Sequence, residues 1–215
     1  MRPANDPAID YKALVRQGYD RCAAAYDRMR QEESNPELAL LTGRLRDGAT
    51  VLDVGCGAGV PVARSLAQRF AVTGVDISGE MIRRATANVP AARFVQGDIM
   101  AVDFPASYFD AAVSFYAILH LPREEHRALF QRIYRWLKPG GYLLATVSAL
   151  GEPPYTDHFF GVTMYWSNYG LSDYEQMLVD VGFDLLEVGA VGHGYGEAYQ
   201  GADEHHPLVF AQRRI

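Results

Sequence analysis

An apolar run that ends in alternating glycines constrains the fold of this chain more than any other feature. Residues 51–54 have the composition of a buried parallel strand, and Gly55, Gly57 and Gly59 follow at once. Residues 61–70 then have the hydrophobic period of a helix. Glycines in such a turn allow a sharp bend and let a ligand lie against main-chain N–H groups. The strand, turn and helix therefore predict a site for a nucleotide cofactor.

Acidic residues around the turn indicate which cofactor this is. A dinucleotide site has the spacing G-x-G-x-x-G, and Val60 stands here where the third glycine would fall. Asp53, two positions before Gly55, would repel a diphosphate and would suit an ammonium group. Asp76 and Asp98, which end the next two expected strands, could accept ribose hydroxyls and an adenine amino group. With no lysine or arginine placed to bind phosphates, the site fits S-adenosylmethionine and does not fit NAD.

Three further motifs follow the glycine turn of residues 53–59 in a fixed order. They are Val-Asp-Ile-Ser at 75–78, Gln-Gly-Asp-Ile at 96–99 and Leu-Lys-Pro-Gly-Gly at 137–141. Together the motifs resemble those of class I S-adenosylmethionine-dependent methyltransferases, in the small-molecule branch (methyltransferase domain 11/25-like), and the resemblance runs from about residue 19 to the C-terminus. It implies a Rossmann-like, doubly wound α/β fold. The seven-stranded sheet would have the order 3-2-1-4-5-7-6 with an antiparallel last strand, helices on both faces and an N-terminal helical cap. A single glycine motif would leave a generic Rossmann domain as the alternative.

Composition sets further limits. A chain of 215 residues with 49% hydrophobic content can bury one core, so we expect one domain with a helical cap (1–48), a cofactor-binding core (49–148) and a lid loop, helix and final strand pair (149–215). The net charge of −6, without a block of Lys or Arg, disfavours nucleic acid as a partner. With only two cysteines, Cys22 and Cys56, we expect neither a disulfide nor a metal site. Without a transmembrane-length apolar run or a signal peptide, we expect a cytoplasmic protein, monomeric or homodimeric, that does not bind membranes.

Helical and strand patterns alternate along the chain, as expected for a parallel sheet with helices on both faces. Strands are expected near 50–54, 71–76, 92–97, 110–115, 141–148, 183–190 and 207–213. Helices are expected near 9–31, 35–48, 60–69, 79–88 and 123–137. A last helix should end at Gly182, and Ser172 and Glu175 have the spacing of its capping box. His126 is expected on an exposed helix face.

The resemblance also implies which residues contact the cofactor. They are Tyr19, Tyr26, Asp53, Gly55, Cys56, Gly57, Asp76, Ile77, Met81, Asp98, Ile99, Phe115 and Tyr116. Tyr19 and Tyr26 are seven positions apart and share one helix face, from which they would cover the methionine end of the cofactor and shield its methyl group. Plain amphipathic packing of this helix is the alternative, although a phenol buried for packing still needs a hydrogen-bond partner.

Residues 114–122 follow the fourth expected strand and, by the same resemblance, border the transferred methyl group. His120 is the candidate general base, because imidazole titrates near neutral pH. Tyr19 and Tyr116 are the other candidate catalytic residues. The alternative for His120 is structural: it could cap a turn or orient the helix that begins after Pro122.

Residues 151–170 are rich in aromatic side chains and have no clear period, which predicts a lid or pocket loop. The candidate acceptor contacts are His120, Tyr155, Phe159, Tyr165 and Trp166, with His193 from a later glycine-rich turn. Aromatic walls exclude water and attract a cation, and both effects favour methyl transfer. Stacking of these aromatics against the sheet is the alternative. Because His193, His205 and His206 have no known ligand spacing, no metal is expected.

These observations predict transfer of a methyl group from a sulfonium to an O, N or S nucleophile of a small metabolite. Carbon methylation through a cysteine adduct is disfavoured, because neither cysteine has the surroundings of a nucleophile. Ser114-Phe115-Tyr116 also replaces the Asn/Asp-Pro-Pro-Tyr/Phe motif of enzymes that methylate amino groups of nucleic acids. Two alternatives remain: a cofactor-binding enzyme with another activity, such as a cyclase, and a regulatory subunit on the same fold.

Overall fold

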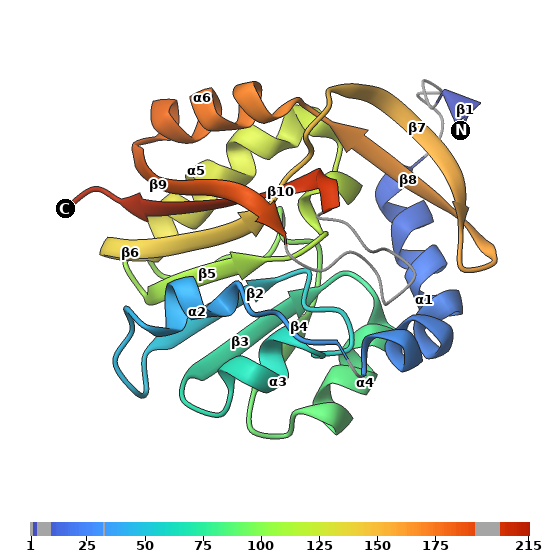
Figure 1. Cartoon of the computed structure of the whole chain (residues 1–215). Coiled ribbons are helices and arrows are strands. Elements are labelled where there is room, and N and C mark those ends of the chain that lie inside the picture. Colours follow the sequence, from blue (N-terminus) through green and yellow to red (C-terminus); the bar gives the residue numbers. More distant parts are fainter. Residues whose placement is uncertain (1, 4–9, 32, 192–202) are drawn as a thin grey trace.

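Seven strands form the central sheet in the part of the chain that the computed structural model describes, residues 2–3, 10–31, 33–191 and 203–215 (Figure 1). They are β2 (Thr50–Val54), β3 (Ala71–Asp76), β4 (Arg93–Gln96), β5 (Phe109–Ser114), β6 (Leu137–Thr146), β9 (Phe183–Val191) and β10 (Asp203–Arg213). Their order is β4-β3-β2-β5-β6-β10-β9, and β10 runs antiparallel to both neighbours. Numbered along the chain, this is 3-2-1-4-5-7-6. The predicted doubly wound, Rossmann-like α/β topology is confirmed.

Alternating strand residues divide the core between the two faces of this sheet. The helices that cover the faces are α2 (Leu38–Thr42) and α3 (Val62–Leu66) on one side and α5 (His126–Trp136) and α6 (Leu171–Val181) on the other. Leu52 of β2 belongs to the same buried cluster as Trp136 of α5. Its neighbour Val51 belongs to the cluster of Leu41 in α2. Full burial of one such aliphatic side chain contributes about 1.5–3 kcal/mol, so both faces stabilise the sheet.

Two helices on the first face are shorter than the sequence predicted. α2 stops at Thr42 instead of continuing to Gly48: the Gly43 N–H makes the last helical bond, to the Ala39 carbonyl, and the Arg44 N–H then donates to the Leu41 carbonyl only three residues back. α3 has 5 residues, and single turn bonds continue the chain to Phe70. In both cases short turns satisfy the last helical carbonyls, so the polypeptide leaves the helix early.

The ends of α6 show one wrong prediction and one confirmed prediction. The expected capping box of Ser172 and Glu175 is wrong, because the N-cap is Gly170, two residues before Ser172, and Asp173 takes the place of Glu175. The Gly170 N–H donates to Asp173 Oδ2 at 3.3 Å. Gly182 ends the helix as predicted, with φ of 117°, and its N–H donates to carbonyls of the last turn.

His126 is fully buried at the start of α5, so the prediction of an exposed face is wrong. Its Nε2–H donates to the Leu121 carbonyl at 3.1 Å, because a carbonyl oxygen can only accept. Nδ1 then accepts from the Tyr174 hydroxyl of α6 at 3.0 Å. Burial lowers the pKa of His126 to about 4, which keeps it neutral. The sequence pattern of α5 could not show that a distant helix covers this side chain.

The predicted lid loop is wrong, because residues 151–170 form a β-hairpin. β7 (Glu152–Phe159) and β8 (Val162–Asn168) pair antiparallel, and β1 (Arg2–Pro3) joins β7, which gives a separate three-stranded sheet among the described residues. Phe160 and Gly161 form the turn between them, with φ of 47° and 83°. Positive φ at both positions is the geometry of a tight type I′ hairpin turn.

The N-terminal helical cap is α1 (Tyr11–Arg30), which lies between β8 and α4 (Gly79–Asn88) (Figure 1). On the β8 side, Val15 is buried with Met164. On the α4 side, Ala23 is buried with Met81. Both helices lie where the sequence predicted them. In the described ranges, no helix combines the length and the apolar composition needed to span a membrane.

Candidate cofactor and acceptor site

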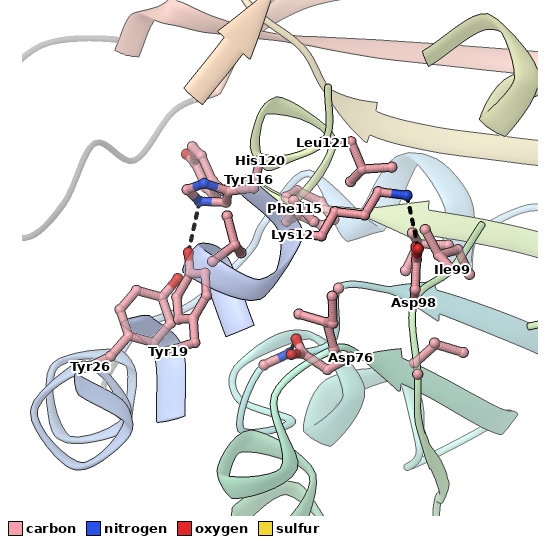
Figure 2. Close-up of a pocket in the computed structure, with 18 residues that line it drawn as sticks. Lys12, Tyr19, Tyr26, Asp76, Asp98, Ile99, Phe115, Tyr116, His120 and Leu121 are labelled. Atoms are coloured by element: carbon pink, nitrogen blue, oxygen red, sulfur yellow. Dashed lines mark hydrogen bonds and ion pairs between the residues drawn. The ribbon is translucent and has the colours of Figure 1, made fainter. Parts of the chain in front are cut away.

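A cavity of about 720 Å³, partly open to solvent, lies between α1 and the carboxyl ends of β2, β3, β4 and β5 (Figure 2). Open α/β sheets bind ligands at this edge, where the carboxyl ends of the strands meet. The cavity is lined by Lys12, Val15, Tyr19, Tyr26, Val54, Gly55, Gly57, Val75, Asp76, Ile77, Gly97, Asp98, Ile99, Phe115, Tyr116, Ala117, His120 and Leu121.

The glycine turn after β2 forms one side of the cavity, and its glycines have different roles. Gly55 has φ of 71°, and an added Cβ would lie 2.1 Å from Cβ of Ala117. Gly57 has φ of 52°, but an added Cβ there would meet nothing closer than the Tyr26 ring at 4.0 Å. Gly55 therefore permits close packing of the chain after β5, whereas Gly57 leaves space on the cavity side.

Asp76 ends β3 and faces the cavity beside this turn. Its Oδ2 accepts from the Gly57 N–H and its Oδ1 from the Ser78 N–H, both at 2.9 Å. Burial raises the pKa of Asp76 to about 6, against the effect of these hydrogen bonds. A carboxylate has about four acceptor positions, so Asp76 can still accept from a ligand's hydroxyl groups.

Three of the predicted cofactor contacts are buried and are not among the residues that line the cavity, although Asp53 directly precedes the lining residues Val54 and Gly55. Asp53 is 2% exposed, and its Oδ2 has no hydrogen-bond partner among the described residues. Burial, and then the nearby Asp76, raise the pKa of Asp53 to about 7. Cys56 and Met81 are buried too, and Met81 packs in the cluster beneath α1. A buried carboxylate oxygen without a partner is unfavourable, and an ammonium group of a ligand would compensate it.

The third acidic residue, Asp98, is paired with a lysine that the sequence reading missed. Asp98 Oδ1 accepts from the Met100 N–H at 2.9 Å, and Oδ2 binds Lys12 Nζ at 2.8 Å (Figure 2). The prediction that no lysine or arginine is placed to bind phosphates did not include this lysine, which is paired with a carboxylate. Lys12 does share a helix face with Tyr19 and Tyr26, since the three stand at intervals of seven residues, and this spacing was a usable signal.

Tyr19 and His120 are brought together in the same cavity. The Tyr19 hydroxyl lies 2.8 Å from His120 Nε2 (Figure 2). The Nδ1 atom of the same ring lies 2.8 Å from the Tyr165 carbonyl. The carbonyl can only accept, so Nδ1 carries the proton and Nε2 accepts from Tyr19. Burial lowers the pKa of His120 to about 4. His120 is thus a neutral imidazole with its lone pair directed at Tyr19.

Tyr116 and Phe115 line the cavity directly after β5. Tyr116 has φ of 57°, and its N–H donates to Thr146 Oγ1 at 2.6 Å. The Arg30 guanidinium lies 5.7 Å from the centres of both the Tyr116 and Tyr26 rings. Thr146 and Arg30 carry no sequence motif, and only the folded structure shows their position.

The aromatic residues of the β7–β8 hairpin pack behind the cavity wall instead of lining it. Phe159 lies 6.0 Å from the Tyr19 ring and 5.9 Å from the Tyr26 ring, and Trp166 lies 5.5 Å from His120. Tyr155 stacks on Trp166, and Tyr165 contributes its carbonyl to His120. His193, another predicted acceptor contact, lies outside the described residues, and no group of three potential metal ligands occurs within them.

Comparison with known proteins places this site in a known family. The family model described as "Methyltransferase domain" matches residues 51–141. Phosphoethanolamine N-methyltransferase 3 of Arabidopsis thaliana is 36% identical over 149 residues, which cover 65% of this chain and 30% of that protein. The chain spans less than half the length of the curated relatives it matches.

Solved structures share the fold at low identity. The 1,6-didemethyltoxoflavin-N1-methyltransferase of Burkholderia thailandensis has a TM-score of 0.72 at 21% identity, covering 99% of this chain and 94% of that one. The cyclase SpnF has a TM-score of 0.70 at 21% identity, covering 99% and 100%. At these identities the likeness shows the fold.

The sheet order and the cavity at the strand ends define a Rossmann-like protein that binds a nucleotide-type cofactor. Together with the matching family model, they show that residues 51–141 form a class I S-adenosylmethionine-dependent methyltransferase domain.

Proposed function

We propose that the chain transfers a methyl group from S-adenosylmethionine to an oxygen, nitrogen or sulfur atom of a small molecule by in-line displacement. One observation carries the proposal: Asp76 and Asp98, suited to a nucleoside, line the same cavity as the Tyr19–His120 pair. The Arabidopsis relative and the Burkholderia neighbour are both N-methyltransferases by name, which supports a nitrogen acceptor among the three.

The residues present fit the cofactor. The partnerless Oδ2 of buried Asp53 suits its ammonium group, and the remaining acceptor capacity of Asp76 suits the ribose hydroxyls. Asp98 suits the adenine amino group, between Ile77 and Ile99 of the cavity wall. The space beside Gly57 lets the ligand approach main-chain N–H groups. Tyr26 and Phe115 would enclose the methionine end.

When bound, the cofactor supplies an electrophilic methyl group on a positively charged sulfur. Tyr19 and His120 then take up the proton that the acceptor loses. The acceptor's proton passes to the Tyr19 oxygen as the Tyr19 proton passes to His120 Nε2. The imidazolium so formed keeps both N–H groups bonded, Nδ1 to the Tyr165 carbonyl and Nε2 to Tyr19. Tyr116 of the cavity wall excludes water and orients the acceptor, and the hairpin aromatics Phe159 and Trp166 support Tyr19 and His120 from behind.

Two measurements test the cofactor and the transfer separately. Calorimetry should show binding of S-adenosylmethionine to the wild type and at least tenfold weaker binding to Asp76→Ala, since one ribose contact is lost. Incubation with small amines, alcohols, phenols and thiols should give S-adenosylhomocysteine in proportion to a methylated product. Equal cofactor affinity of wild type and Asp76→Ala would contradict the proposal.

The proposed proton path gives a sharper prediction. With the acceptor found in that screen, Tyr19→Phe and His120→Ala should each lower kcat by about 100-fold, in the range of general acid–base catalysis, and leave the cofactor Kd within about twofold. Because the two side chains act in one path, the double variant should be no slower than the worse single variant. Unchanged kcat in both single variants would show that the pair only packs.

A second candidate function is an S-adenosylmethionine-binding enzyme that is not a transferase. The observation in its favour is the cyclase SpnF, which covers this chain almost completely. Conversion of an acceptor without formation of S-adenosylhomocysteine would support this candidate over methyl transfer.

The remaining expectations belong to the same proposal. We take the chain as one domain, with its cap at 1–48, its cofactor core at 49–148 and its last part at 149–215. We also expect a monomer or homodimer in the cytoplasm that acts on small molecules and not on nucleic acid, in line with the net charge of −6.

A further inference from the structure

One lysine ties the first turn of α1 to two carboxylates of the core. Lys12 Nζ lies 2.8 Å from Asp98 Oδ2 and 2.6 Å from Glu125 Oε2 (Figure 2 shows the first of these contacts). The three side chains are between 24% and 34% exposed, so solvent screens them only in part. The chain has 20 basic residues, and its lysines are Lys12 and Lys138 alone, which makes this ammonium easy to follow by experiment.

The position of Lys12 is unfavourable for the helix itself. A cation in the first turn of a helix interacts poorly with the positive end of the helix dipole, at a cost of about 0.3–1 kcal/mol. The two ion pairs offset that cost. Asp98 follows β4, and Glu125 ends η2 (Arg123–Glu125), the short 3-10 helix that precedes α5. One side chain of α1 thus joins two separate segments of the core.

The other polar contacts of α1 lie further along the helix. Asp20 Oδ1 accepts from Ser78 Oγ at 2.6 Å, where α4 begins. Asp27 of α1 forms an ion pair with Arg84 Nη1 of α4 at 3.2 Å. Of these three contacts, the Lys12–Asp98 ion pair lies at the side of the cavity proposed for the adenine, because both residues line the cavity.

We propose that Lys12 is a positioning residue that closes the first turns of α1 over the adenosine end of the cofactor pocket. The proposal rests on the proposed function, because it takes S-adenosylmethionine as the ligand. Closure does not compete with the adenine amino group for Asp98. The carboxylate has about four acceptor positions, and Lys12 and the Met100 N–H use two. The closed helix also carries Tyr19 and Tyr26 to the other end of the pocket, so the same contact helps to hold both ends of the ligand.

The first test compares the two lysines. Lys12→Met removes the charge and keeps most of the length, and we expect it to weaken S-adenosylhomocysteine binding and to speed its dissociation by about fivefold, the effect of partly exposed ion pairs. Lys12→Arg should restore most of the affinity. Lys138→Met is the matched control, because Lys138 pairs with Asp110 at 2.8 Å near the opposite end of β5. It should leave the Kd unchanged.

The second test uses the carboxylate that does not line the cavity. Glu125→Gln should reproduce part of the Lys12→Met effect, whereas Glu124→Gln, at a neighbouring and more exposed position, should have none. In the double variant Lys12→Met/Glu125→Gln, the second change should add little, because the two residues act through one contact.

A third measurement needs no variant. Limited acetylation of the wild type followed by mass spectrometry gives the reaction rates of both lysines. S-adenosylhomocysteine should slow acetylation of Lys12 by about fivefold and leave Lys138 unchanged, because the ligand favours the closed helix.

The outcomes separate this inference from the proposed function. If the wild type does not bind S-adenosylhomocysteine, the proposed function is overturned and this inference with it. If the wild type binds and Lys12→Met binds equally well, the inference is overturned and the proposed function stands. Equal loss in Lys12→Met and Lys138→Met would mean that the effect is general destabilisation, and that result also contradicts the inference.

Discussion

Tyr116 is held in a strained backbone conformation by a side chain that no motif marks. Its φ of 57° is uncommon for an aromatic residue, and such residues persist where the surroundings fix them. The fixing contact is the hydrogen bond of 2.6 Å from the Tyr116 N–H to Thr146 Oγ1 at the end of β6. Thr146 is fully buried, so water does not replace this acceptor easily.

Thr146→Val should therefore lower the free energy of unfolding by about 1–3 kcal/mol, the cost of leaving a buried donor without its acceptor. Thr146→Ser keeps the hydroxyl and should lose less than half as much. Urea denaturation of the three proteins measures both values. A serine variant as unstable as the valine variant would show that packing of the Thr146 methyl group, and not the hydrogen bond, holds Tyr116.

The glycines of the turn differ in a way that mutation can separate. Gly55→Ala places Cβ 2.1 Å from Ala117 Cβ, so it should destabilise the fold by several kcal/mol, roughly as strong overpacking does. Gly57→Ala meets open space and adds only the strain of φ at 52°, about 1 kcal/mol. Thermal unfolding checks this order. Calorimetry should show that Gly57→Ala still loses cofactor affinity, because its methyl group points toward the ligand space.

Among the larger elements, the β7–β8 hairpin sets the electrostatics of the candidate base without lining the pocket. The Tyr165 carbonyl fixes the tautomer of His120, and Trp166 covers its ring at 5.5 Å. Burial lowers the pKa of His120 to about 4. The hairpin therefore keeps His120 neutral at physiological pH.

Trp166→Ala should raise the pKa of His120 by about one unit toward its usual value, because water then reaches the ring. An NMR titration of the histidine ring protons measures this. His126 is an internal control, since its pKa is also about 4 but its cover comes from α6. Its titration should not change. A shift of both histidines would point to loosening of the whole protein.

The elements that the sequence predicts well are those with a strong local signal. The sheet strands and α4 have clear periods and end in glycine or acidic motifs, and the strand order followed from the family resemblance. The hairpin at 152–168 was missed, because Tyr165 and Trp166 place aromatic side chains on both faces of β8 and remove the alternation that marks a strand. His126 and Lys12 were misjudged for another reason. Their surroundings come from α6 and from the loop after β4, and no local pattern reports contacts so far along the chain.

At the scale of the whole molecule, the buried carboxyl groups and the buried histidines have opposite effects on how stability changes with pH. Burial raises the pKa of Asp53 to about 7 and of Asp76 to about 6, so the folded state holds these protons. Their stabilisation is complete below about pH 4 and is lost as pH rises through the folded pKa values. His120 and His126, with pKa values of about 4, act in the other direction. Their stabilisation is complete above about pH 6.5 and is lost as pH falls. The net stability should thus change little between these limits.

Asp53→Asn separates one of these contributions from the rest. The variant keeps the size of the side chain and all the other titrating groups, so the difference in unfolding free energy between variant and wild type reports Asp53 together with its coupling to Asp76. The pKa of Asp53 rises from the usual 3.8 to about 7 on folding. Between pH 4.5 and pH 8 the wild type should therefore lose about 2–4 kcal/mol of unfolding free energy relative to the variant. Urea denaturation without ligand measures it. Bound S-adenosylhomocysteine should reduce the change, because its ammonium group stabilises the ionised Asp53. Parallel curves over this pH range would mean that Asp53 ionises in the folded protein as it does in the unfolded chain, and the proposed ammonium contact would lose its physical basis.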